Sequence, residues 1–209
     1  RSLGQKICEV VGGRGTHPVT AVAGGMSNHL SKDMREKLKG YATEAMELAA
    51  VAVNEGKKAL VNNKDLLSIL PLPVHNLGTV KDGMLDLYDG AIRVQRGDGS
   101  VAGEFDIETY KDHLFEEALP YTYSKQVFYR DPAGKPAPYR VGALARINCA
   151  DGISTPKAQA ELEQFKQRCG NPSSFTVMHH YARLIELLHC AERALEILSD
   201  DEIISDDTK

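Results

Sequence analysis

Residues 174–200, SFTVMHHYARLIELLHCAERALEILSD, carry the most regular hydrophobic pattern in the chain. Their apolar side chains recur at alternating spacings of four and three: Val177, Tyr181, Leu184, Leu188, Ala191, Leu195 and Leu198. This spacing places them on one face of a long helix. A helix with such a face must bury it against another element, so the chain is expected to be built on long, packed helices.

Two more segments have the features of long helices. Residues 32–62 repeat apolar positions at helical spacing after Ser31, which can cap the first turn. In STPKAQAELEQFKQRCGNP, Pro156 suits the first helical turn and Gly170 suits a left-handed stop. These segments predict a helical core at about 1–65 and 150–200.

The middle of the chain has a different pattern. From residue 78 to 106 apolar and polar residues alternate, and Asp89-Gly90 and Asp98-Gly99 are typical hairpin turns. Residues 107–118 are helical in pattern, whereas QVFYRD and YRVGALARI suggest strands. We therefore predict an α+β fold that is predominantly helical, a long-helix bundle with a small antiparallel β-rich insertion at about 77–146.

Composition excludes several classes of function. The net charge is −4 without a block of Lys or Arg, which argues against nucleic acid as a partner. No apolar run is long enough for a membrane span. The cysteines form no C-x-x-C pair and are interpreted as buried free thiols in a reducing compartment: Cys8, Cys149, Cys169 and Cys190.

The stretch GGRGTHPV, residues 12–19, follows a short helical segment. Its glycines suit a helix stop, and it lacks the Lys-Ser/Thr pair of a phosphate-binding loop. Pro18 restrains His17 toward extended backbone and so fixes the direction of its imidazole. Local sequence leaves two interpretations of Arg14 and His17 open: a purely structural pair, or residues that orient a thiolate or a metal ligand.

The other polar residues form no recognisable catalytic set. His179, His180 and His189 do not share one helix face, so they are not predicted to bind a metal. The carboxylates of the last helices are interpreted as solvated, and no nucleophile with a base and an orienting group follows from the spacing.

The segment GQKICEVVGGRGTHPVTAVAGGMSNHLS resembles the Gly-Gly-Arg-x-x-His-Pro segment of nickel-iron hydrogenase large (alpha) subunits. GMLDLYDGAIRV, YRVGALARIN, TPKAQAELEQF and YARLIELLHCAERALEIL resemble the corresponding stretches in order, so the resemblance spans nearly all of residues 1–209. It is closest to the cytoplasmic branch, whose acceptors are NAD(P), deazaflavin or viologen-type compounds. The chain begins at Arg1 inside a helical pattern, and we expect it to be a central fragment of such a subunit.

The resemblance implies an intact enzyme that reversibly oxidises H2 at a nickel-iron centre. It passes the electrons to iron-sulfur clusters of a small subunit, from which they reach further electron-transfer subunits. The nickel-iron centre is held by two C-x-x-C pairs, which this chain lacks. The fragment itself is therefore expected to be metal-free, inactive and prone to self-association.

The resemblance also suggests roles for individual residues. By matching position, His17 would lie near the metal centre or the nearest cluster, and Arg14 would have an interface or oriented-charge role. Arg140, Arg146 and Asn148, in YRVGALARIN, are further candidates of the same kind. No catalytic residue and no metal ligand is expected within the chain.

Two alternatives remain open at this stage. The first is a relative without the cysteine pairs, of the kind found as the quinone-site subunit of respiratory complex I. The second is a non-catalytic helical interaction module, in which the His-Pro loop is only structural.

Overall fold

The computed structural model describes residues 2–60, 65, 69 and 71–207. The chain folds into two compact units, unit 1 comprising Arg1–Asn54 with Leu187–Lys209 and unit 2 comprising Glu55–Glu186. The two longest helices, α2 (Lys32–Leu60) and α6 (His179–Ser199), contribute residues to both units. Within the described residues, no helix combines the length and the apolar character that a membrane span requires.

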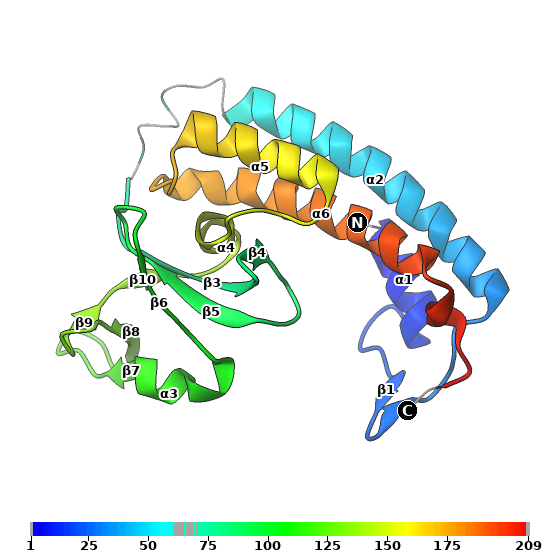
Figure 1. The fold of residues 1–209 in the computed structure, drawn as a ribbon, viewed down its shortest axis with the longest axis horizontal. Helices are drawn as coiled ribbons and strands as arrows, with labels where there is room; N and C mark the ends of the chain where they lie inside the picture. The colour runs from blue at the N-terminus through cyan, green and yellow to red at the C-terminus, as the bar shows by residue number, and fades with distance from the viewer. Residues whose placement is uncertain (1, 61–64, 66–68, 70, 208–209) are drawn as a thin grey trace. The chain divides into compact units, whose positions relative to one another are not determined.

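Unit 1 is mainly helical (Figure 1). Besides its parts of α2 and α6 it contains α1 (Ser2–Gly12), the hairpin of β1 (Ala21–Val22) and β2 (Gly25–Met26), and a 3-10 turn, η4 (Asp201–Ile204). Leu38, Ala42 and Leu198 form its buried centre. Arg35 Nη1 lies 2.7 Å from Asp201 Oδ1, so the acidic tail, which the sequence suggested would fray, is partly ordered.

Unit 2 contains two sheets. The larger has the strand order β10-β3-β5-β6, with β4 paired to β3, and the smaller has the order β7-β8-β9. The strands of the larger sheet are β3 (His75–Lys81), β4 (Met84–Leu85), β5 (Ala91–Gln95), β6 (Val101–Phe105) and β10 (Tyr139–Arg140). Those of the smaller are β7 (Leu114–Glu117), β8 (Gln126–Arg130) and β9 (Pro136–Ala137). Neighbouring strands are antiparallel except β10 and β3, which are parallel.

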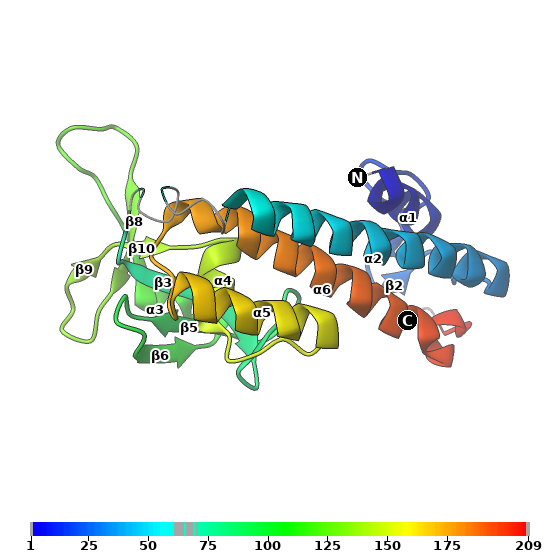
Figure 2. The same ribbon diagram turned by 90° about the horizontal axis from the view of Figure 1, so that it is seen from above.

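The helical elements of unit 2, apart from its parts of α2 and α6, are η2 (Ile107–Thr109), α3 (Tyr110–His113), α4 (Ala143–Cys149), α5 (Pro156–Cys169) and η3 (Thr176–Met178). Helix α5 runs alongside the first part of α6 in both views (Figures 1 and 2). Phe165 and Tyr181 meet edge to face there, with ring centroids 5.4 Å apart. Lys57 Nζ lies 2.6 Å from Glu161 Oε1, which ties the end of α2 to α5.

The long helices begin and end close to the predicted positions. The Ser31 hydroxyl accepts a hydrogen bond from Met34 N at 3.2 Å, as expected of an N-cap. Helix α5 begins at Pro156 and ends just before Gly170, which has a φ of +91°. Residues 61 and 62, the predicted end of α2, lie outside the described residues.

The prediction of a predominantly helical bundle with a small antiparallel insertion is not confirmed. The described residues form a mixed α and β structure with three sheets, one of which includes a parallel pair. The weight of the β structure was underestimated because its strands are short and interrupted by turns. One such turn, Asp82-Gly83, was missed although both residues have positive φ and close a two-residue hairpin.

Two local predictions were wrong. Residues 107–118 are helical only to His113, because 114–117 pair with β8 as strand β7. The stretch YRVGALARI is a strand only at Tyr139–Arg140 and then becomes α4. Six of the seven residues of α4 are buried, and a helix buried on all sides has no polar face that would reveal its period in the sequence.

Helix α4 packs directly on strand β3 at Gly78. A Cβ atom added at Gly78 would lie 2.7 Å from Arg146 Cα, a distance that real Cβ contacts do not reach. The glycine therefore permits the closest approach of α4 to the sheet.

We expect Gly78→Ala to lower the free energy of unfolding by about 1–3 kcal/mol, because the new methyl group must push α4 away from β3. Gly103→Ala is the matched control, since a Cβ at this β6 position meets no atom within 4 Å. Urea denaturation followed by circular dichroism measures both. Equal midpoints for the two variants would show that the close approach has no energetic importance.

Candidate functional site

Polar side chains gather inside unit 2 where α4 meets strands β3 and β5 and the segment that precedes α6. We call this set the buried polar cluster, and its members are Asn76, Arg93, Gln95, Arg140, Asn148 and Ser173. Each is at most 9% exposed. Because polar groups in an apolar interior are costly unless they are paired, their hydrogen bonds fix how these elements fit together.

Asn148 is the central member of the buried polar cluster. Its amide Nδ2 donates to Asn76 Oδ1 at 3.1 Å and to the Ser173 carbonyl at 3.0 Å. Its Oδ1 accepts from Ser173 N at 3.0 Å. One side chain on α4 thus binds strand β3 and both backbone groups of Ser173.

Arg140 binds the same segment from the end of β10. Its guanidinium donates to the carbonyls of Leu72 at 2.8 Å, Ser174 at 3.1 Å and Ser173 at 3.3 Å. Burial lowers the pKa of Arg140 from its usual range. All the acceptors that the structure gives this cation are backbone carbonyls, so it acts as a clamp on two stretches of chain.

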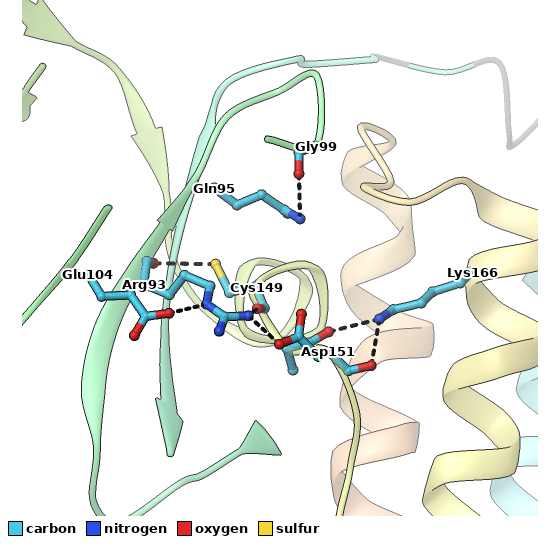
Figure 3. Close-up of polar contacts among 8 residues, drawn as sticks. Arg93, Gln95, Gly99, Glu104, Cys149, Asp151 and Lys166 are labelled. Carbon is cyan, nitrogen blue, oxygen red and sulfur yellow. Dashed lines mark hydrogen bonds and ion pairs between the residues drawn. The ribbon is translucent and has the colours of Figure 1, made fainter. Parts of the chain in front are cut away.

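Arg93 forms the other end of the cluster (Figure 3). It contacts Glu104 through Nε at 2.6 Å, and Asp151 and the Cys149 carbonyl through Nη1 at 2.9 Å each. Burial disfavours the charged form, but the hydrogen bonds from Asp151 and Glu104 outweigh it, and the pKa of Arg93 is raised. Lys166 on α5 donates to the carbonyl of Asp151 at 3.2 Å, which connects α5 to the same segment.

The thiol of Cys149 lies against the sheet, with Sγ 3.4 Å from the carbonyl oxygens of both Asn76 and Arg93. Burial raises the pKa of Cys149 to about 12. A thiol with this pKa remains protonated near neutral pH and is a poor nucleophile and a poor metal ligand. Its role in the cluster is to donate to β3 and β5.

Arg146 lies at the edge of this region and forms a bidentate ion pair with Glu186 at 2.7 and 2.9 Å. Such pairs have strict geometry, and this one joins α4 to α6. Close by, the backbone N–H of Leu144 donates to His179 Nδ1 at 3.4 Å. Burial lowers the pKa of His179, and the positive charge of Arg140 adds to the effect.

Arg14 and His17 belong to unit 1, and both are exposed or half-buried. Arg14 Nε donates to the His17 carbonyl at 2.6 Å, so the two residues do meet. The φ of His17 is +52°, and the expected extended backbone is therefore wrong at this residue. The left-handed region is uncommon but accessible to histidine, and the Arg14 hydrogen bond holds the turn.

The structure thus brings Arg140 and Asn148 together on Ser173, and places Arg146 on the same helix as Asn148. Their proposed role near a metal centre stays a prediction, as does that of Arg14 and His17. Sequence reasoning missed the partners Asn76, Gln95 and Ser173. A signal was present, because Gln95 and Arg93 interrupt the apolar pattern of a strand in AIRVQ.

The cysteines of this chain do not fit an iron-sulfur cluster or another metal centre. Clusters are held by several cysteine thiolates that converge on one point. Cys149 and Cys169 are buried, whereas Cys8 and Cys190 are exposed. Among the described residues, no group of three or more His, Cys, Asp and Glu side chains is placed to hold a metal ion.

Unit 1 has an open apolar groove of about 660 Å3. Its walls include Ile7, Val10, Met34, Ala194, Ile197 and Leu198, and Glu202 and Asp207 also line it. Exposed apolar surface of this kind is typical of a region that contacts other protein. The expected self-association of the isolated chain is compatible with it and stays a prediction.

Comparison with known proteins shows where similar chains occur. No protein-family model matches the sequence. The chain is 38% identical to a subunit of the vhc F420-non-reducing hydrogenase of Methanococcus voltae, over its whole length and 45% of the relative. It is 31% identical to an iron-sulfur subunit of the F420-non-reducing hydrogenase of Archaeoglobus profundus, covering 98% of this chain and 45% of that one. These relatives are hydrogenase subunits.

A solved structure agrees with the sequence relatives. The crystal structure of an NAD+-reducing NiFe hydrogenase in the H2-reduced state contains a chain that matches with a TM-score of 0.86 at 29% identity. The match covers all of this chain and 47% of that one. The chain therefore spans about half the length of the hydrogenase subunits that it resembles.

These comparisons correct several predictions. The chain was expected to belong to a nickel-iron large (alpha) subunit, to serve a nickel-iron centre as cofactor, and to have an iron-sulfur small subunit for its partner. The relative whose name states an iron-sulfur character is itself an iron-sulfur subunit, which contradicts all three points. Neither the complex I type of subunit nor the helical interaction module is supported.

We expect Asn148→Ala to lower the free energy of unfolding by about 2–4 kcal/mol, because it leaves Ser173 N and Asn76 Oδ1 buried without their partner. The exposed Asn28→Ala is the control and should change stability by less than about 0.5 kcal/mol. Urea denaturation compares them. A loss for Asn148→Ala no larger than for the control would show that the cluster is not an energetic centre.

The lowered pKa of His179 predicts a pH dependence. The unfolded chain, in which the pKa is near 6.5, binds the proton at a higher pH than the folded chain does. Stability from this group is therefore complete above about pH 6.5 and decreases as the pH falls toward the folded-state pKa. Thermal unfolding between pH 7 and 5 should show a smaller decrease in Tm for His179→Gln than for the wild-type chain. His180→Gln, next to it and exposed, should retain the wild-type slope.

Proposed function

We propose that this chain is part of a subunit of a hydrogenase, an oxidoreductase complex that acts on H2. The observation that carries the proposal is the TM-score of 0.86 with one half of a hydrogenase chain, together with sequence similarity along the whole of the present chain. Its partners would be other subunits of the complex, and its location would be cytoplasmic.

Within that subunit, the described residues are suited to a framework role. The buried polar cluster joins β3, β5, β10, α4 and the segment before α6 through specific hydrogen bonds. Such a network favours one arrangement of the backbone over others, because each alternative leaves a buried group unpaired. The proposed contribution of this chain is to hold adjoining parts of the complex in a fixed geometry.

The test uses the full-length protein that contains this chain, affinity-tagged in its native cells and purified without oxygen. We expect the tagged preparation to catalyse hydrogen-dependent reduction of methyl viologen and to contain other subunits in fixed ratio. An unrelated protein with the same tag is the control. Good recovery of the tagged protein, with all hydrogen-dependent activity left in the unbound fraction, would refute the proposal.

A further inference from the structure

Two buried polar atoms of unit 2, Gln95 Oε1 and Ser173 Oγ, have no hydrogen-bond partner among the described residues. Ser173 is 1% exposed and Gln95 is 9% exposed. Native structures rarely leave such groups unpaired, because each loses its hydration without compensation. These two atoms therefore indicate a further ligand.

Both atoms belong to the buried polar cluster, and two routes of contact connect them. Gln95 lies opposite Asn76 in the sheet, and Asn148 joins Asn76 to the Ser173 carbonyl. Along the second route Gln95 Nε2 is 3.4 Å from the carbonyl of Gly99, as Figure 3 shows. A Cβ at Gly99 would in turn lie 3.0 Å from Cδ of the residue that precedes Ser173.

The chemistry of the two atoms restricts what can bind between them. An amide oxygen only accepts hydrogen bonds, whereas a hydroxyl donates one and accepts others. An anion cannot bind the Gln95 oxygen. A cation would add a second positive charge close to Arg140, whose guanidinium already contacts the Ser173 carbonyl. A small neutral group that both donates and accepts satisfies both atoms.

We propose that a buried water molecule bridges Gln95 Oε1 and Ser173 Oγ. It donates one proton to the amide oxygen and exchanges a hydrogen bond with the hydroxyl. Internal waters commonly occupy such positions, where they serve two to four polar groups that the protein leaves unpaired. This water links β5 to the segment before α6, a connection that the direct hydrogen bonds of Asn148 make only from β3 and α4.

Ser173→Ala distinguishes an occupied site from a dry one by the sign of its effect. If the water is bound, the variant removes one of its partners, and Tm should decrease by about 2–6 °C. If the site is dry, the variant deletes an unpaired hydroxyl, and Tm should stay the same or increase. Ser124→Ala, an exposed loop position, is the matched control and should leave Tm unchanged.

Gln95→Met gives the second arm of a double-mutant cycle in the full-length protein. When one water connects the two side chains, the double variant should lose less than the sum of the single losses. Additive losses, or an increase in Tm for Ser173→Ala, would overturn the proposal. A high-resolution crystal structure gives the direct test: we expect a water within hydrogen-bonding distance of both atoms, and a direct Gln95–Ser173 hydrogen bond or a dry site would contradict it.

Discussion

The contact between α4 and β3 is the constraint on which unit 2 depends. Gly78 lets the backbone of α4 approach the sheet so closely that a methyl group has no space. At this separation the short polar side chain of Asn148 reaches Asn76 on the strand, and the thiol of Cys149 reaches the strand carbonyls. A wider gap would leave these buried groups without partners. Steric fit at one glycine therefore determines whether the polar interior is satisfied.

The buried polar cluster is specific because its partners are mostly backbone groups of chain segments without regular structure. Arg140 places a guanidinium among three carbonyls, and Asn148 binds both the N–H and the carbonyl of Ser173. Apolar packing alone would tolerate small displacements of such segments, whereas these bonds do not. This rigidity is what a portion of a large multisubunit enzyme needs if it is to position its neighbours.

The two units differ in how completely they bury their apolar surface. In unit 2 the sheet, α4 and α5 enclose a continuous interior that includes Val94, Ile147 and Phe165. Unit 1 leaves an open groove between its helices and its tail. The similar subunits are about twice as long as this chain. Unit 1 thus has apolar surface available for contact with further protein.

The sequence by itself determined the long helices, because α2, α5 and α6 keep an apolar face at the helical period and have recognisable caps at Ser31 and Gly170. It also determined the resemblance to hydrogenases, since the matching segments occur in order along the whole chain. The kind of subunit was predicted incorrectly, because shared framework segments do not reveal which cofactor the rest of a subunit holds.

Tertiary structure alone decided the rest. Helix α4 is buried on nearly every side, so its sequence has no polar period and was taken for a strand. Arg140 and Asn148 were selected by resemblance, but their shared partner Ser173 lies 25 or more residues away in the chain and has no local signature. Long-range hydrogen bonds between buried groups follow from how elements meet in space, and a linear pattern cannot specify them.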